Sequence, residues 1–94
     1  KKMNDDWRLD GYFDYLIGCC FEKKDFHSSK NNDHEHCVFC WLKITDADIK
    51  EEHISYGYVT VPQNTNQENW VCPRCFSDFK NEFKFYEKIN RNNS

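Results

Sequence analysis

The sequence predicts a small α+β domain, and three observations carry this prediction. Two C-x-x-C pairs, Cys37 with Cys40 and Cys72 with Cys75, are separated by 31 residues. A run of β-branched and aromatic residues before the second pair favours a β-hairpin. Phenylalanines after that pair recur at spacings of three or four residues, which places them on one face of a helix.

The length and composition of the chain are typical of one domain. Residues 1–94 are therefore expected to form a single unit. A domain of this size has a modest hydrophobic core, so a metal ion or another staple would help it to fold. Aromatic residues make up 17% of the chain, which is enough bulky apolar material for a core and excludes global disorder.

Residues 1–35 are expected to form an aromatic extension followed by a polar loop. The apolar residues of its first half predict a short helix or turn packed against the core. Residues 19–26 are predicted to form a strand, and residues 27–35, rich in Ser, Asn, Asp and His, a loop. Because neighbours in a strand point to opposite faces, Cys19 and Cys20 are not expected to share a metal ion.

Residues 36–89 are expected to form the core of the domain around the cysteine pairs. Residues 45–53 begin with a Thr-x-x-Asp pair that is typical of helix caps, so a short helical turn is predicted there. Residues 56–61 and 70–71 predict the two strands of a hairpin, with residues 62–69 as the polar loop between them.

The last predicted element is a helix from about residue 73 to residue 89. Its apolar face carries Phe76, Phe79, Phe83 and Tyr86. Another face carries Lys80, Lys84 and Lys88, and the acidic residues mixed among these lysines predict a solvated, self-compensated surface.

The cysteine pairs predict a structural zinc site. Zinc prefers four thiolate or imidazole ligands in a tetrahedron, and a two-residue gap lets both sulfurs of a pair reach one ion. Cys37, Cys40, Cys72 and Cys75 are therefore the expected ligands of one Zn²⁺. The second pair falls where the hairpin enters the helix, and the amides of a helix N-terminus stabilise thiolate charge.

Histidines and tryptophans lie near the same motifs. His34 and His36 could replace a cysteine or form a second site, although four thiolates already complete a tetrahedron. His53 lacks an identifiable catalytic partner and is expected to be structural. Trp41 and Trp70 flank the cysteine pairs and are expected to shield the metal from water.

The order of zinc knuckle, hairpin and helix over residues 36–89 resembles a treble-clef zinc finger, which would make the fold a small treble-clef-like zinc domain with an aromatic N-terminal extension. The strings HCVFCW and WVCPRCFSDF are similar to small bacterial proteins of unknown function with paired C-x-x-C motifs. This likeness implies a lineage and no activity.

A second resemblance implies iron instead of zinc. The string WVCPRC, residues 70–75, is similar to the second iron-binding box of rubredoxins, which are electron carriers. Rubredoxin boxes usually continue with glycine after the second cysteine. Trp41 and Phe76 stand at those positions here, and bulky residues where φ > 0 is often needed argue against two such knuckles.

The expected function is that of a zinc-binding protein-interaction or adaptor module that is not an enzyme. No nucleophile elbow or phosphate-binding glycine loop is present, and four cysteines close the coordination of zinc. A nucleic-acid-binding zinc finger that uses the final helix is the alternative, but a net charge of −3 disfavours it. The best candidates for anchors of a protein partner are Trp7, Tyr12, Tyr15, Tyr56 and Tyr58.

The expected location is the cytoplasm. No apolar run is long enough to span a bilayer, and residues 1–6 contain no apolar stretch like that of a signal peptide. In a reducing compartment, six cysteines favour metal or redox chemistry over a disulfide framework.

Overall fold

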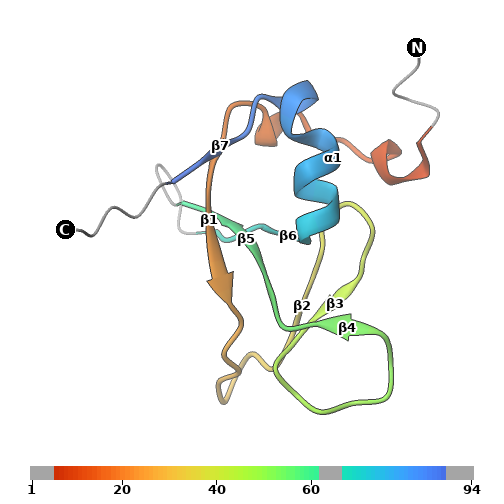
Figure 1. Ribbon diagram of the computed structural model, residues 1–94, viewed down its shortest axis with the longest axis vertical. Coiled ribbons are helices and arrows are strands. Elements are labelled where there is room, and N and C mark those ends of the chain that lie inside the picture. Colours follow the sequence, from red (N-terminus) through yellow and green to blue (C-terminus); the bar gives the residue numbers. More distant parts are fainter. Residues whose placement is uncertain (1–5, 62–66, 89–94) are drawn as a thin grey trace.

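The computed structural model of the chain describes residues 6–61 and 67–88, and its architecture is α+β (Figure 1). The described residues form two small sheets and one α-helix. Among them, no helix has the length and apolar character needed to cross a membrane.

The larger sheet has four strands in the order β6-β5-β1-β7. They are β1 (Cys20–Asp25), β5 (Tyr56–Thr60), β6 (Trp70–Val71) and β7 (Tyr86–Glu87). Strand β5 pairs antiparallel with both β1 and β6, whereas β1 and β7 are parallel. The predicted N-terminal strand and the predicted hairpin are both confirmed, while residues 62–66 of the hairpin loop lie outside the described residues.

The smaller sheet has three short strands in the order β2-β3-β4. They are β2 (Glu35–His36), β3 (Lys43–Ile44) and β4 (His53–Ile54). Strands β2 and β3 are antiparallel, so the chain reverses direction between them, at the first cysteine pair. Strands β3 and β4 are parallel.

The helical turn predicted over residues 45–53 is wrong. The segment between β3 and β4 is irregular. Thr45 is buried, and its hydroxyl donates to the carbonyl of Asp33 at 2.8 Å and accepts the N–H of Ala47 at 3.2 Å. The hydroxyl that the sequence offers as a helix cap therefore ties two loops together, which is a known competitor of helix formation.

The helix α1 (Pro73–Phe83) begins as predicted and ends six residues early. Lys84 takes the left-handed conformation at φ 56°, and the N–H of Phe85 bonds the carbonyl of Lys80 at 3.0 Å, which terminates the helix. The placement of Tyr86 on the helix face is therefore wrong, because Tyr86 lies in β7 and is 64% exposed. Lys88 also lies beyond the helix, so the predicted lysine stripe is broken.

The phenylalanine face of α1 is buried as predicted, and it packs on the larger sheet. Phe76, Phe79 and Phe83 are buried in the main core cluster. Phe85, which follows the helix, is buried in place of Tyr86. The main cluster also contains Leu16, Phe21, Phe39 and Val71.

The N-terminal segment consists of two 3-10 turns, in agreement with the expected short helix or turn. These are η2 (Trp7–Leu9) and η3 (Asp14–Leu16), and the second one buries Leu16 completely. Gly18 then adopts φ 75°, and its N–H bonds the carbonyl of Phe83 at 2.8 Å. This bond ties the segment to the end of α1, beside which it runs in Figure 1.

Candidate metal centre

Four cysteine sulfurs converge between the smaller sheet and the N-terminus of α1. The sulfurs of Cys37, Cys40, Cys72 and Cys75 all lie within 4.8 Å of one another, an arrangement that could hold a metal ion. Three of the residues are buried, whereas Cys40 is half-buried. All six cysteines of the chain are free thiols.

The first pair lies in a tight turn between β2 and β3. The N–H of Cys37 bonds the carbonyl of Leu42, and the N–H of Trp41 bonds the carbonyl of Cys37, both at 2.9 Å. Trp41 adopts φ 67° to close this turn. Trp41 therefore adopts the left-handed conformation that is expected to disfavour a bulky residue in a rubredoxin-type knuckle, at a strain of about 1–2 kcal/mol. Phe76, at the second such position, is helical.

The second pair lies at the start of α1. Cys72 is the N-cap residue, with extended φ and ψ, and Pro73 opens the helix. No side-chain oxygen caps the helix, and its first turn contains no acidic residue. The free amides and the positive end of the helix dipole therefore favour negative charge on the two sulfurs.

A backbone hydrogen bond brings the two pairs together. The N–H of Val38, inside the knuckle, bonds the carbonyl of Trp70 in β6 at 3.0 Å. Because β6 leads directly into α1, this bond fixes the knuckle over the start of the helix.

The spacing of the sulfurs fits tetrahedral coordination. A tetrahedron with metal–sulfur bonds of about 2.3 Å has edges of about 3.8 Å. The Sγ atoms of Cys40 and Cys72 lie 3.7 Å apart. Four soft thiolates in a largely buried cluster suit zinc or iron and are poor ligands for calcium or magnesium.

The cluster stabilises thiolate charge through its own hydrogen bonds. Bonds with the Cys37 and Cys75 thiols lower the pKa of Cys72 to about 4. Hydrogen bonds with the Cys37 and Cys72 thiols, together with burial, raise the pKa of Cys75. Metals bind the deprotonated form of cysteine, so a divalent cation held by these sulfurs would release protons on binding.

The three histidines considered as ligands or catalytic groups make other contacts. Nδ1 of His34 lies 2.7 Å from Oδ1 of Asp33, and the His36 ring packs against Trp41 at 5.5 Å. Nδ1 of His53 lies 2.8 Å from the carbonyl of Glu51. In the part of the chain that the structure describes, the four cysteines are the one group able to hold a metal, and no histidine belongs to it.

The prediction that Trp41 and Trp70 shield the cluster is wrong. Trp41 is 69% exposed, because the left-handed turn directs it outward. Trp70 is buried, but it packs in a second cluster with Phe26, Ile44 and Val59. Trp70 still positions the site, through the carbonyl that accepts the Val38 N–H.

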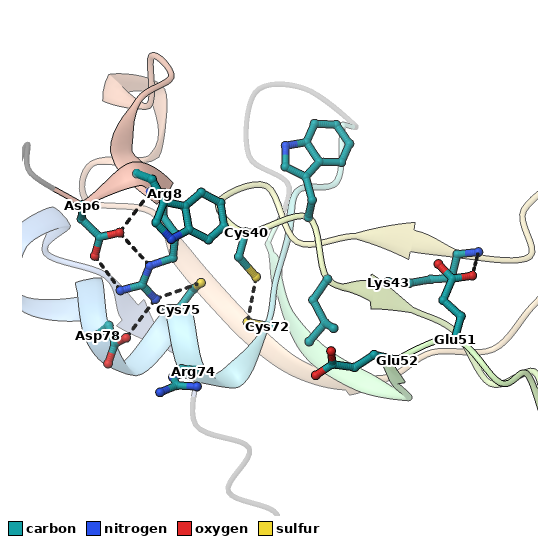
Figure 2. Close-up of a pocket in the computed structure, with 13 residues that line it drawn as sticks. Asp6, Arg8, Cys40, Lys43, Glu51, Glu52, Cys72, Arg74, Cys75 and Asp78 are labelled. Atoms are coloured by element: carbon teal, nitrogen blue, oxygen red, sulfur yellow. Dashed lines mark hydrogen bonds and ion pairs between the residues drawn. The ribbon is translucent and has the colours of Figure 1, made fainter.

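Arg8, which the sequence did not single out, reaches the cluster from the N-terminal segment (Figure 2). Its Nη1 donates to Sγ of Cys75 at 3.5 Å and to Asp78 at 2.9 Å. Two further N–H groups of Arg8 donate to Asp6 at 2.7 and 3.0 Å, and these bonds lower the pKa of Asp6 to about 2. No pattern in the sequence links Arg8 to a cysteine 67 residues away.

An open groove of about 840 Å³ runs beside the cluster (Figure 2). Cys40, Cys72 and Cys75 line its floor, and the exposed Trp7 and Trp41 border it. Its remaining lining is mainly charged, with Asp6, Arg8, Lys43, Glu51, Glu52, Arg74 and Asp78. The cysteine cluster therefore has one side that faces solvent.

Comparisons with protein-family models, with curated proteins and with solved structures find no match to this chain. The resemblances to rubredoxins and to small bacterial C-x-x-C proteins therefore stay predictions from short motifs. What the chain does must be inferred from the geometry of the site.

Proposed function

We propose that this protein is a protein-interaction or adaptor module folded around one structural zinc ion. The observation that carries the proposal is the convergence of four cysteine sulfurs within 4.8 Å of one another, with those of Cys40 and Cys72 3.7 Å apart. Zinc held by Cys37, Cys40, Cys72 and Cys75 would lock the knuckle to α1 and give the domain a rigid surface.

The order of the elements supports a treble-clef-like arrangement. The knuckle lies between β2 and β3, the hairpin is formed by β5 and β6, and α1 carries the second cysteine pair. In a rubredoxin-like site the second pair would lie in another knuckle. Here Phe76 is helical and its N–H bonds the carbonyl of Cys72 at 2.9 Å, which favours zinc over an iron electron carrier.

The proposed role is not enzymatic. A catalytic zinc needs an open coordination position, and four thiolates fill the tetrahedron. The six free thiols suit a reducing compartment, so we place the protein in the cytoplasm.

The aromatic residues of the N-terminal segment are the proposed anchors for a protein partner. Trp7, Tyr12 and Tyr15 are 66%, 76% and 52% exposed. Tyr58 is a weaker candidate, because it stacks on Phe76 at 4.0 Å as part of the packing of the helix. Tyr56 is half-buried beside Lys23.

Binding experiments with the whole chain test this role. Proteins captured by the wild type from its host should be lost with a Trp7→Ala, Tyr12→Ala double variant that keeps its metal and its fold. DNA and RNA at about 0.15 M salt should not bind. Salt-sensitive nucleic-acid binding that disappears when Lys80 and Lys84 are changed would replace the proposal with the zinc-finger alternative.

A further inference from the structure

We infer that Arg8 belongs to the metal centre as an outer hydrogen-bond donor, which fastens the N-terminal segment to the Cys75 thiolate and slows the loss of the metal. This inference rests on the proposed zinc-binding role. It extends the site beyond residues 36–89, where the sequence places it, to a segment that carries no ligand.

The guanidinium of Arg8 is held in one orientation by three neighbours. Asp6 accepts from Nε and Nη2, and Asp78 accepts from Nη1, at 2.7 to 3.0 Å. The guanidinium carbon lies 4.5 Å from the centroid of the Phe79 ring. Only 17% of the Arg8 side chain is exposed, and its Nη1 lies 3.5 Å from Sγ of Cys75.

The negative charge of a zinc–thiolate site would make the contact between Arg8 and Cys75 favourable. Zinc with four thiolates carries two excess negative charges, in a cluster where Cys75 is 1% exposed. Among the described side chains, Arg8 is the only N–H donor that reaches one of these sulfurs. A charge-assisted bond from the guanidinium to the thiolate disperses part of that negative charge.

Metal binding and docking of the N-terminal segment are coupled through this contact. If the metal-bound thiolate strengthens the bond to Arg8, then Arg8 must strengthen metal binding by the same factor. Removing either the metal or the guanidinium should therefore loosen the segment that carries the exposed Trp7.

Arg74 is the matched control for Arg8. It has the same charge, lines the same groove and stands next to Cys75 in α1. Its side chain is exposed, and this side chain makes no hydrogen bond or ion pair with the described residues. Changing it therefore removes an equal charge from the groove without removing a bond to sulfur.

The test uses the whole 94-residue chain loaded with Co²⁺, whose sulfur-to-cobalt charge-transfer band lies in the near ultraviolet. Arg8→Met, Arg8→Lys and Arg74→Met are compared with the wild type in the rate of cobalt loss to excess chelator and in the position of the band. Arg8→Met should lose cobalt ~10-fold faster. Its band should move to longer wavelength, because a thiolate without its N–H bond is a better electron donor.

The rate of cobalt loss from Arg8→Lys should fall between those of the wild type and Arg8→Met, because lysine keeps the charge and loses the planar guanidinium. The rate and band position of Arg74→Met should match those of the wild type. The band reports only folded, metal-loaded protein, so a loss of stability alone does not move it. An unchanged rate and band in Arg8→Met, or an equal change in Arg74→Met, would overturn the inference. Failure of the wild type to bind cobalt would instead refute the proposed function.

Discussion

The Sγ atoms of Cys40 and Cys72 lie 3.7 Å apart, although 31 residues separate them and they belong to different elements. Cys40 ends the knuckle between β2 and β3, and Cys72 caps the start of α1. The hydrogen bond from the N–H of Val38 to the carbonyl of Trp70 holds the knuckle beside the start of α1. A metal bound by these sulfurs would join the knuckle to α1 and stabilise the folded state.

Removing the metal should lower the melting temperature of the protein. Binding to the folded state stabilises by about 4 kcal/mol at a free metal concentration of roughly 1,000 times Kd. Thermal unfolding followed by circular dichroism, with and without a strong chelator, measures the difference. Cys72→Ser should melt as the chelated wild type does, whereas His34→Ala and His36→Ala should keep both metal and stability. An identical melt with and without chelator would show that the cluster is not a structural site.

Trp41→Gly should make the domain more stable than Trp41→Ala by about 1 kcal/mol. Trp41 sits at φ 67°, where glycine is unstrained and alanine is not, and 69% of the side chain is exposed, so little packing is lost in either variant. Chemical denaturation of the two metal-loaded variants measures the gap. Equal stabilities would mean that the knuckle does not need a left-handed residue there.

Lys84→Gly should stabilise the protein by about 1 kcal/mol. Lys84 ends α1 at φ 56°, and its exposed side chain makes no bond among the described residues that glycine would lose. Lys84→Val is the opposing control, because a β-branched residue fits this conformation poorly. If both variants destabilise the protein equally, the helix does not end at Lys84.

Phe83→Ala should destabilise the protein by about 3–5 kcal/mol. Phe83 is 8% exposed and packs against Phe39 and Phe85. Glu82→Ala, which changes an exposed neighbour in the same helix, should be within about 0.5 kcal/mol of the wild type. Urea denaturation gives both values, and similar effects from the two changes would place the wrong face of α1 in the core.

The features that the sequence predicted are those set by local patterns. The spacing of Phe76, Phe79 and Phe83 indicates the buried face of α1, and the cysteine spacing indicates the cluster. The end of α1 was missed because the left-handed residue is a lysine instead of a glycine. The helix then gives way to β7, whose pairing with β1 depends on residues far away in the chain.

The features that were missed depend on long-range contacts. Thr45 has the sequence pattern of a helix cap, but its hydroxyl instead donates a hydrogen bond to the carbonyl of Asp33, 12 residues earlier. In the sequence, Arg8 looks like an ordinary surface cation. In the structure, hydrogen bonds to Asp6 and Asp78 orient its guanidinium toward Cys75. No periodicity or motif encodes such contacts, so only the folded chain reveals them.

The ratio of zinc to protein, measured by elemental analysis of protein purified without added metal, tests the proposed zinc site most directly. The four-sulfur cluster predicts one zinc ion for each chain, and none in Cys72→Ser. Iron in place of zinc, or a wild-type chain that carries no metal, would contradict it.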